Sequence, residues 1–166
     1  MHRSIRSRFA LSLPVLALLV SAASHQPSAN PTQVAGTISL TGKPNDHPEQ
    51  GAGGALIFIG ESKGSNQNTG QPAFMDGAVV VSADTVSLVN GNGTHQGVLI
   101  MSKGSDKVAF KWSGQVTTRL GEDKKPDTNF QGTWTAIDGA SGSGTYEGRF
   151  TPPVASEIHW KGELGK

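Results

Sequence analysis

The chain has 166 residues, including 22 glycines and no cysteine, and it carries 14 Lys and Arg against 13 Asp and Glu. Without cysteine there can be no disulfide, thiolate metal site, thiol nucleophile or redox pair. Three of the arginines and none of the acids lie within residues 1–23, so the remainder has 11 basic and 13 acidic residues and a formal charge of −2. No basic patch is left that would indicate nucleic acid or an anionic membrane as a partner.

Residues 1–23 have the pattern of a secretory signal peptide. A basic start at 1–8 precedes an apolar run at 9–20 and three small residues at 21–23. The apolar run is shorter than the roughly 20 residues that cross a bilayer, so cleavage after Ala23, or after Ala22, is favoured over an uncleaved anchor. We therefore predict a secreted or periplasmic protein with no stable membrane span after cleavage. Residues 24–33 are polar and are predicted to form a disordered leader.

Residues 34–166 lack any helical periodicity and predict a single all-β domain. The first strands are predicted at Val34–Leu40 and at the apolar run Ala55–Ile59, followed in each case by a polar loop, 41–54 and 61–72. The β-branched stretch Ala78–Val89 predicts one long bent strand or two short ones.

An Asn-Gly pair marks a tight hairpin turn at residues 90–91. The remaining strands are predicted at 95–101, 107–116, 129–137, 145–151 and 157–164. Eight or nine strands joined by short turns favour an eight-stranded antiparallel barrel over a β-sandwich, because closure leaves no exposed edge strand.

The segments HQGVLIMSKGSDKVAFKWSG and FQGTWTAIDGASGSGTYEGRF carry a Gly-and-aromatic pattern. In this pattern, residues 97–162 resemble the C-terminal half of the allene oxide cyclase and dirigent-like β-barrel superfamily. The resemblance is stronger to uncharacterised exported bacterial relatives than to the plant enzymes. The resemblance implies an eight-stranded barrel with an apolar central cavity and a possible homo-oligomer. It implies no activity, because the sequence shows no counterpart of the plant cyclase's catalytic acid and the glycine-rich loop is shortened to 138–142.

The candidate ligand-binding residues are large aromatics at inward-facing strand positions: Phe58, Phe110, Trp112, Trp134, Tyr146 and Trp160. An eight-stranded barrel is just wide enough to be filled by side chains or to hold one small ligand. These aromatics therefore either fill the core, which is the more frequent arrangement, or line a cavity.

No set of residues predicts catalysis. Glu61 follows an apolar strand and could act as a base at a cavity rim, although a solvated strand end is the favoured interpretation. Asp106 is expected to be a turn residue, and the pair Glu157 and His159 offers too few ligands for a zinc site. We predict no metal and no cofactor, since phosphate-loop and serine-hydrolase motifs are missing as well.

We therefore expect an exported, soluble, non-enzymatic β-barrel that binds a small apolar ligand or a protein partner. The alternative is a cyclase- or isomerase-like enzyme that holds a lipid-like substrate in the barrel cavity, which requires a buried polar group such as Glu61 facing that cavity. A third hypothesis is an interaction module whose loops 41–54 and 61–72 contact another protein.

Overall fold

The computed structural model describes residues 30–44 and 47–165, so the predicted signal peptide and most of the predicted leader lie outside the described residues. Within these ranges the chain forms nine antiparallel strands and one turn of 3₁₀-helix, η1 (Ala52–Gly54). The strands are β1 (Thr32–Pro44), β2 (Glu49–Gln50), β3 (Leu56–Asn68), β4 (Val79–Val89), β5 (Asn92–Lys103), β6 (Asp106–Leu120), β7 (Pro126–Ile137), β8 (Ser141–Thr151) and β9 (Ala155–Gly165).

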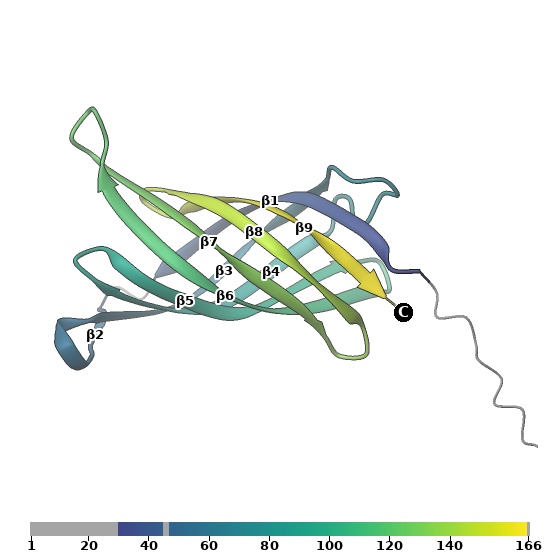
Figure 1. Cartoon of the computed structure of the whole chain (residues 1–166), viewed down its shortest axis with the longest axis horizontal. Coiled ribbons are helices and arrows are strands. Elements are labelled where there is room, and N and C mark those ends of the chain that lie inside the picture. The colour runs from purple at the N-terminus through teal and green to yellow at the C-terminus, as the bar shows by residue number, and fades with distance from the viewer. Residues whose placement is uncertain (1–29, 45–46, 166) are drawn as a thin grey trace, which may run out of the picture.

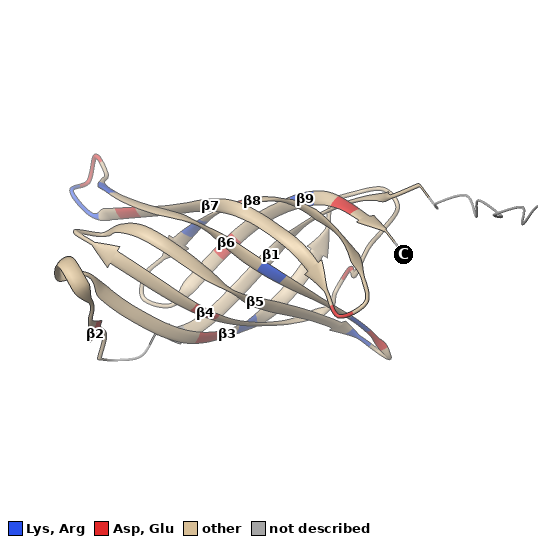
Figure 2. Cartoon of the chain, turned by 60° about the horizontal axis from the view of Figure 1, so that its bottom comes forward, with Lys and Arg blue, Asp and Glu red and all other residues tan. Residues whose placement is uncertain are grey.

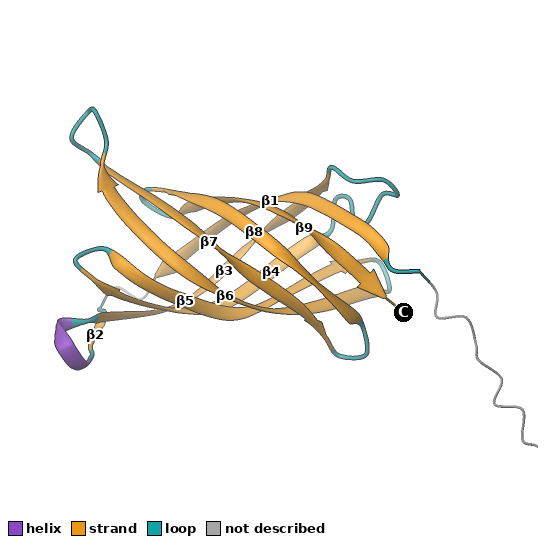
Figure 3. Ribbon diagram, viewed as in Figure 1, coloured by secondary structure: helices purple, strands orange, loops and turns teal. Residues whose placement is uncertain are grey.

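The sheet closes on itself. From β3 to β9 each strand pairs with the next along the chain, β9 pairs with β1, and β1 pairs with β3 over the register from Gly36–Asn68 to Pro44–Gly60. Eight strands therefore form a closed barrel, and the short β2 adds to β3 outside it (Figures 1 and 3). This confirms the predicted all-β antiparallel eight-stranded barrel and excludes the sandwich.

The predicted loop 61–72 is wrong as far as Asn68, and the predicted loop 41–54 is wrong at residues 41–44 and at the two residues of β2. β1 continues to Pro44 and β3 to Asn68, and the two strands pair with each other there. The segment after Ile59 has a loop-like composition because exposed polar residues alternate with small ones facing inward. Small inward residues are needed at this seam, where a Cβ on Gly64 would lie only 1.7 Å from the Ser39 carbonyl oxygen.

The Asn90–Gly91 turn is confirmed. Its residues have φ values of 51° and 77°, and the flanking Val89 and Asn92 pair with each other. Positive φ at both central positions is the geometry of a type I′ turn, which matches the twist of the strands that it joins. The turn therefore fixes the register of the β4–β5 hairpin.

Side chains alternate between a mainly apolar interior and a mainly polar exterior. The buried core includes Val34, Ile38, Leu40, Val80, Leu99, Met101, Phe110, Trp134, Tyr146 and Trp160. Charged residues are scattered over the outer surface and gather at the tip of the β6–β7 hairpin (Figure 2). The part of the chain that the structure describes contains no helix with the length and apolar character that a membrane crossing requires.

Candidate functional site

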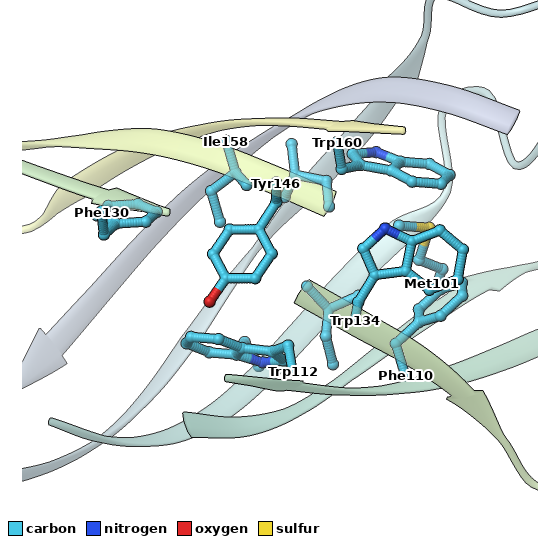
Figure 4. Close-up of a pocket in the computed structure, with 11 residues that line it drawn as sticks. Met101, Phe110, Trp112, Phe130, Trp134, Tyr146, Ile158 and Trp160 are labelled. Atoms are coloured by element: carbon cyan, nitrogen blue, oxygen red, sulfur yellow. The ribbon is translucent and has the colours of Figure 1, made fainter. Parts of the chain in front are cut away.

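The barrel interior has two halves, which meet near Trp112 and Tyr146. The half that we call the filled half lies toward the β5–β6 turn, where Phe110, Trp134 and Trp160 are 4–5% exposed. Ring centroids are 5.1 Å apart for Phe110 and Trp134 and 5.9 Å apart for Trp134 and Trp160, both in edge-to-face contact (Figure 4). Such pairs are favoured by the ring quadrupoles and add to the energy of burial.

Two glycines make room for the Trp134 ring. A Cβ on Gly144 or on Gly162 would lie 2.4–2.5 Å from atoms of the Trp134 indole, so the indole lies flat over bare backbone on β8 and β9. The indole Nε1 donates to the carbonyl of Lys161 at 3.2 Å. A ring of this size fits inside eight strands because the next two strands, β8 and β9, carry no side chain at the positions in register with Trp134.

The β3–β4 loop closes the outer end of the filled half. Buried Asn66 accepts a hydrogen bond from Trp160 Nε1 at 2.9 Å, and its amide donates to the carbonyl of Met75 at 3.0 Å. The loop residue Phe74 packs edge-on against Trp160, with centroids 6.1 Å apart. One buried amide thus links the loop to the aromatic core.

Between the two halves the interior leaves a space of about 50 Å³ (Figure 4). Apart from Ser82, its lining is apolar: Ile38, Leu99, Met101, Phe110, Trp112, Phe130, Trp134, Tyr146, Ile158 and Trp160. A small space with apolar walls stays dry and is too small for most ligands. We regard it as a packing gap rather than a binding site.

The open half, toward the Asn90–Gly91 turn, holds a cavity of about 310 Å³. This volume is at the lower end of the range for small-molecule pockets and about twice that of a cavity known to take up benzene. It is lined by Leu40, Gly42, Phe58, Gly60, Ser62, Ser82, Asp84, Val86, Leu88, His95, Trp112, Val116, Thr118, Thr128, Phe130, Phe150, Val154, Ser156 and Ile158. Ten of these nineteen residues are apolar or aromatic, two are glycines and seven are polar, so apolar walls carry a set of polar groups as in typical ligand sites.

His95 lies at the inner end of this cavity. Its Nε2 is 2.9 Å from the Tyr146 hydroxyl oxygen, and its ring is in edge contact with Trp112, Phe130 and Tyr146 at centroid distances of 4.6, 5.4 and 5.6 Å. Burial lowers the pKa of His95 to about 4 and raises the pKa of Tyr146. Both groups are therefore neutral at pH 7 and share one hydrogen bond.

Asp84 is the acid in the cavity. It lies on β4 opposite Gly97 of β5, where a Cβ on the glycine would come within 2.9 Å of the Asp84 Cβ, so the glycine leaves room for the aspartate. Burial raises the pKa of Asp84 from 3.8 to about 6. No described residue forms a hydrogen bond or ion pair with its carboxylate. A carboxylic acid with this pKa exchanges protons close to neutrality, which suits both ligand recognition and acid–base chemistry.

The structure distributes the six predicted ligand-binding aromatics over both halves. Phe58 and Trp112 line the cavity of the open half. Phe110, Trp134 and Trp160 are packed in the filled half, and Tyr146 lines the 50 Å³ space and reaches the cavity through its bond to His95.

The hypothesis that Glu61 faces the cavity is wrong. Glu61 points outward from β3 with its side chain 60% exposed, and its Oε1 is 3.2 Å from Lys63 Nζ. Asp106 is exposed beside the β5–β6 turn, and His159 forms an exposed contact of 3.2 Å with Glu157. Among the described residues, no three His, Cys, Asp or Glu side chains gather into a group that could hold a metal ion.

Sequence reasoning missed Asp84 and considered His95 only as a metal ligand. His95 could have been found, because it alternates in phase with Leu99 and Met101 and so points inward with them. Asp84 gives a weaker signal, because the β-branched residues around it occur on both faces of β4. The sequence therefore does not show which of the two faces points into the barrel.

No family model, curated protein or solved structure matches this chain. The resemblance of residues 97–162 to the allene oxide cyclase and dirigent-like superfamily therefore stays a prediction.

Proposed function

We propose that this protein is an exported β-barrel that binds a small, mainly apolar molecule in the open half of its interior without transforming it. The observation that carries the proposal is the cavity of about 310 Å³, whose walls are mainly apolar and aromatic and include seven polar residues. An apolar ligand gains free energy by leaving water for such a site, roughly 25 cal/mol for each Å² of apolar surface buried. The predicted signal peptide supports export, and the predicted homo-oligomer stays a prediction.

Filling the cavity tests this proposal. Val86 lines the cavity, while its neighbour Thr85 lies on the opposite face of β4. Wild-type protein should enhance the fluorescence of the neutral probe N-phenyl-1-naphthylamine in a saturable titration. Val86→Trp should weaken this binding at least tenfold, whereas Thr85→Trp should leave it within about twofold. Saturable binding that Val86→Trp does not alter would contradict the proposed location, and a lack of any binding would contradict the function.

A second candidate function is catalysis of the cyclase or isomerase type on a lipid-like substrate. The observation that favours it is the placement of Asp84 and the His95–Tyr146 pair around one cavity, because a carboxylic acid with a pKa of about 6 can serve as a general acid or base. Incubation with a lipid extract would reveal an isomerisation as a product of unchanged mass and altered retention time. Catalysis by Asp84 predicts that Asp84→Asn abolishes this product, and a product that persists in the variant would exclude that role.

A further inference from the structure

The described lining of the cavity contains an acidic residue but no positively charged residue to neutralise it. Among the described lining residues, Asp84 alone is an acid, and none is Lys or Arg. The other titratable groups around it are His95 from β5 and Tyr146 from β8, and burial keeps both neutral at pH 7. Above its pKa of about 6, the Asp84 carboxylate is therefore the only formal charge among the described residues that line the cavity.

The Asp84 carboxylate also lacks a partner. The residue is half-buried, and no hydrogen bond or ion pair joins its carboxylate, which faces the open cavity, to any described residue. Two residues earlier on the same face of β4, Ser82 is 2% exposed and its hydroxyl has no hydrogen-bond partner among the described residues. Trp112, which also lines the cavity, has a buried indole Nε1 without a partner among the described residues, so an occupant of the cavity is positioned to accept from Trp112 and to bond to Ser82.

The aromatic walls suit the same kind of occupant. Four rings line the cavity, those of Phe58, Trp112, Phe130 and Phe150. Aromatic faces carry negative electrostatic potential and attract cations, and this attraction grows when the site is desolvated. A carboxylate together with aromatic rings and without a competing cation is an arrangement that recognises a protonated amine.

We propose that the ligand of the open half is a small amine with an apolar body, whose ammonium group pairs with the Asp84 carboxylate while its apolar part lies among the aromatic rings. This inference rests on the proposed function and narrows it to one ligand class. A neutral ligand would leave the carboxylate without a counter-charge, and an anionic ligand would be repelled by it.

A series of isosteres tests the charge preference. Calorimetric titrations at pH 7.5 would compare 2-phenylethylamine, 2-phenylethanol and phenylacetate, which share one ring and differ in charge. We expect the amine to bind at least tenfold more tightly than the alcohol, and phenylacetate to bind most weakly. In Asp84→Asn the amine and the alcohol should agree within about twofold. Asp106→Asn, a matched change at an exposed site, should retain the full preference.

The pH dependence of the wild-type protein gives a test that needs no variant. Lowering the pH from 7.5 to 5 protonates Asp84 and should weaken amine binding several-fold while the affinity for the alcohol falls less. Equal affinities for amine and alcohol, or a preference that survives in Asp84→Asn, would overturn the inference and leave the proposed function intact. If neither these ligands nor the neutral probe binds, the proposed function itself fails.

Discussion

The filled half and the open half of the barrel are built from the same eight strands, but they differ in the size of the side chains that point inward. The filled half carries Met101, Phe110, Trp134 and Trp160, all buried. The open half carries smaller groups at many inward positions, among them Gly60, Ser62, Asp84, Thr118, Thr128 and Ser156. Strand number sets the width of a barrel, but the residue chosen at each inward position decides whether that width holds side chains or a ligand.

The largest expected effect comes from removing a ring from each half. Trp134→Ala should lower the free energy of unfolding by about 3–5 kcal/mol, because it removes a buried indole from the more tightly packed half and enlarges the small space beside it. Phe150→Ala should cost only about 1–2 kcal/mol, since the half-buried Phe150 already borders empty space. Urea denaturation measures both. Equal losses of unfolding free energy would show that the two halves are packed equally tightly, which would contradict the division into a filled and an open half.

The next effect concerns the amide that links the β3–β4 loop to the filled half. Asn66→Ala should lower the free energy of unfolding by about 2–4 kcal/mol, because it leaves the buried Trp160 indole N–H without a partner and removes one of the two hydrogen bonds to the Met75 carbonyl, which still accepts from the Ala78 N–H. Ser65→Ala, an exposed neighbour, should cost less than about 0.5 kcal/mol and serves as the control. Probe binding in the open half should remain unchanged in both variants. A loss below about 1 kcal/mol in Asn66→Ala would contradict the linking role of the amide.

Asp84 is expected to make stability depend on pH. Because its folded-state pKa is raised from 3.8 to about 6, the stabilisation that it contributes is fully present below pH 3.8 and is lost as the pH rises through 6. Asp84→Asn should therefore be more stable than wild type by about 1–3 kcal/mol at pH 8, with the difference vanishing by about pH 4.

The titration of His95 changes the stability with pH in the opposite direction. Its pKa is lowered from 6.5 to about 4, so its contribution is present above pH 6.5 and is lost as the pH falls through 4. His95 is retained in both proteins and cancels in their difference. Thermal unfolding of wild type and Asp84→Asn between pH 4 and pH 8 measures this difference, and a constant difference across the range would contradict the burial of Asp84.

The smallest effect is expected on the outer surface. Glu61→Gln removes one partner of an exposed ion pair with Lys63 and should change the free energy of unfolding by less than about 0.5 kcal/mol. It should also leave ligand binding unchanged, in contrast to Asp84→Asn. A loss of binding in Glu61→Gln would show that the outer surface of β3 takes part in recognition.

The fold could be predicted from the sequence because its signals are local. Alternation in HQGVLIM and the Asn90–Gly91 turn each specify a strand or a hairpin without reference to the rest of the chain. The continuation of β3 through Gly64 and Asn66 was missed, because those small and polar residues are favourable only where β1 lies close against them.

The candidate site was predictable in part. Phe58 and Trp112 were expected at a cavity and lie there, whereas the sequence could not separate them from Trp134 and Trp160, which share their inward phase. Whether an aromatic lies in the open half or in the filled half depends on its position along the barrel axis. That position follows from the register of all eight strands. Asp84 could not be singled out because the sequence did not establish which face of β4 points into the barrel.

Nuclear magnetic resonance of the three tryptophan indole N–H groups can show in which half of the barrel a ligand binds. Trp112 borders the cavity of the open half, whereas Trp134 and Trp160 are packed in the filled half. Titration of ¹⁵N-labelled protein with 2-phenylethylamine or N-phenyl-1-naphthylamine should move the Trp112 signal and leave the other two nearly unchanged. Three stationary signals, or movement confined to Trp134 and Trp160, would contradict a ligand site in the open half of the barrel.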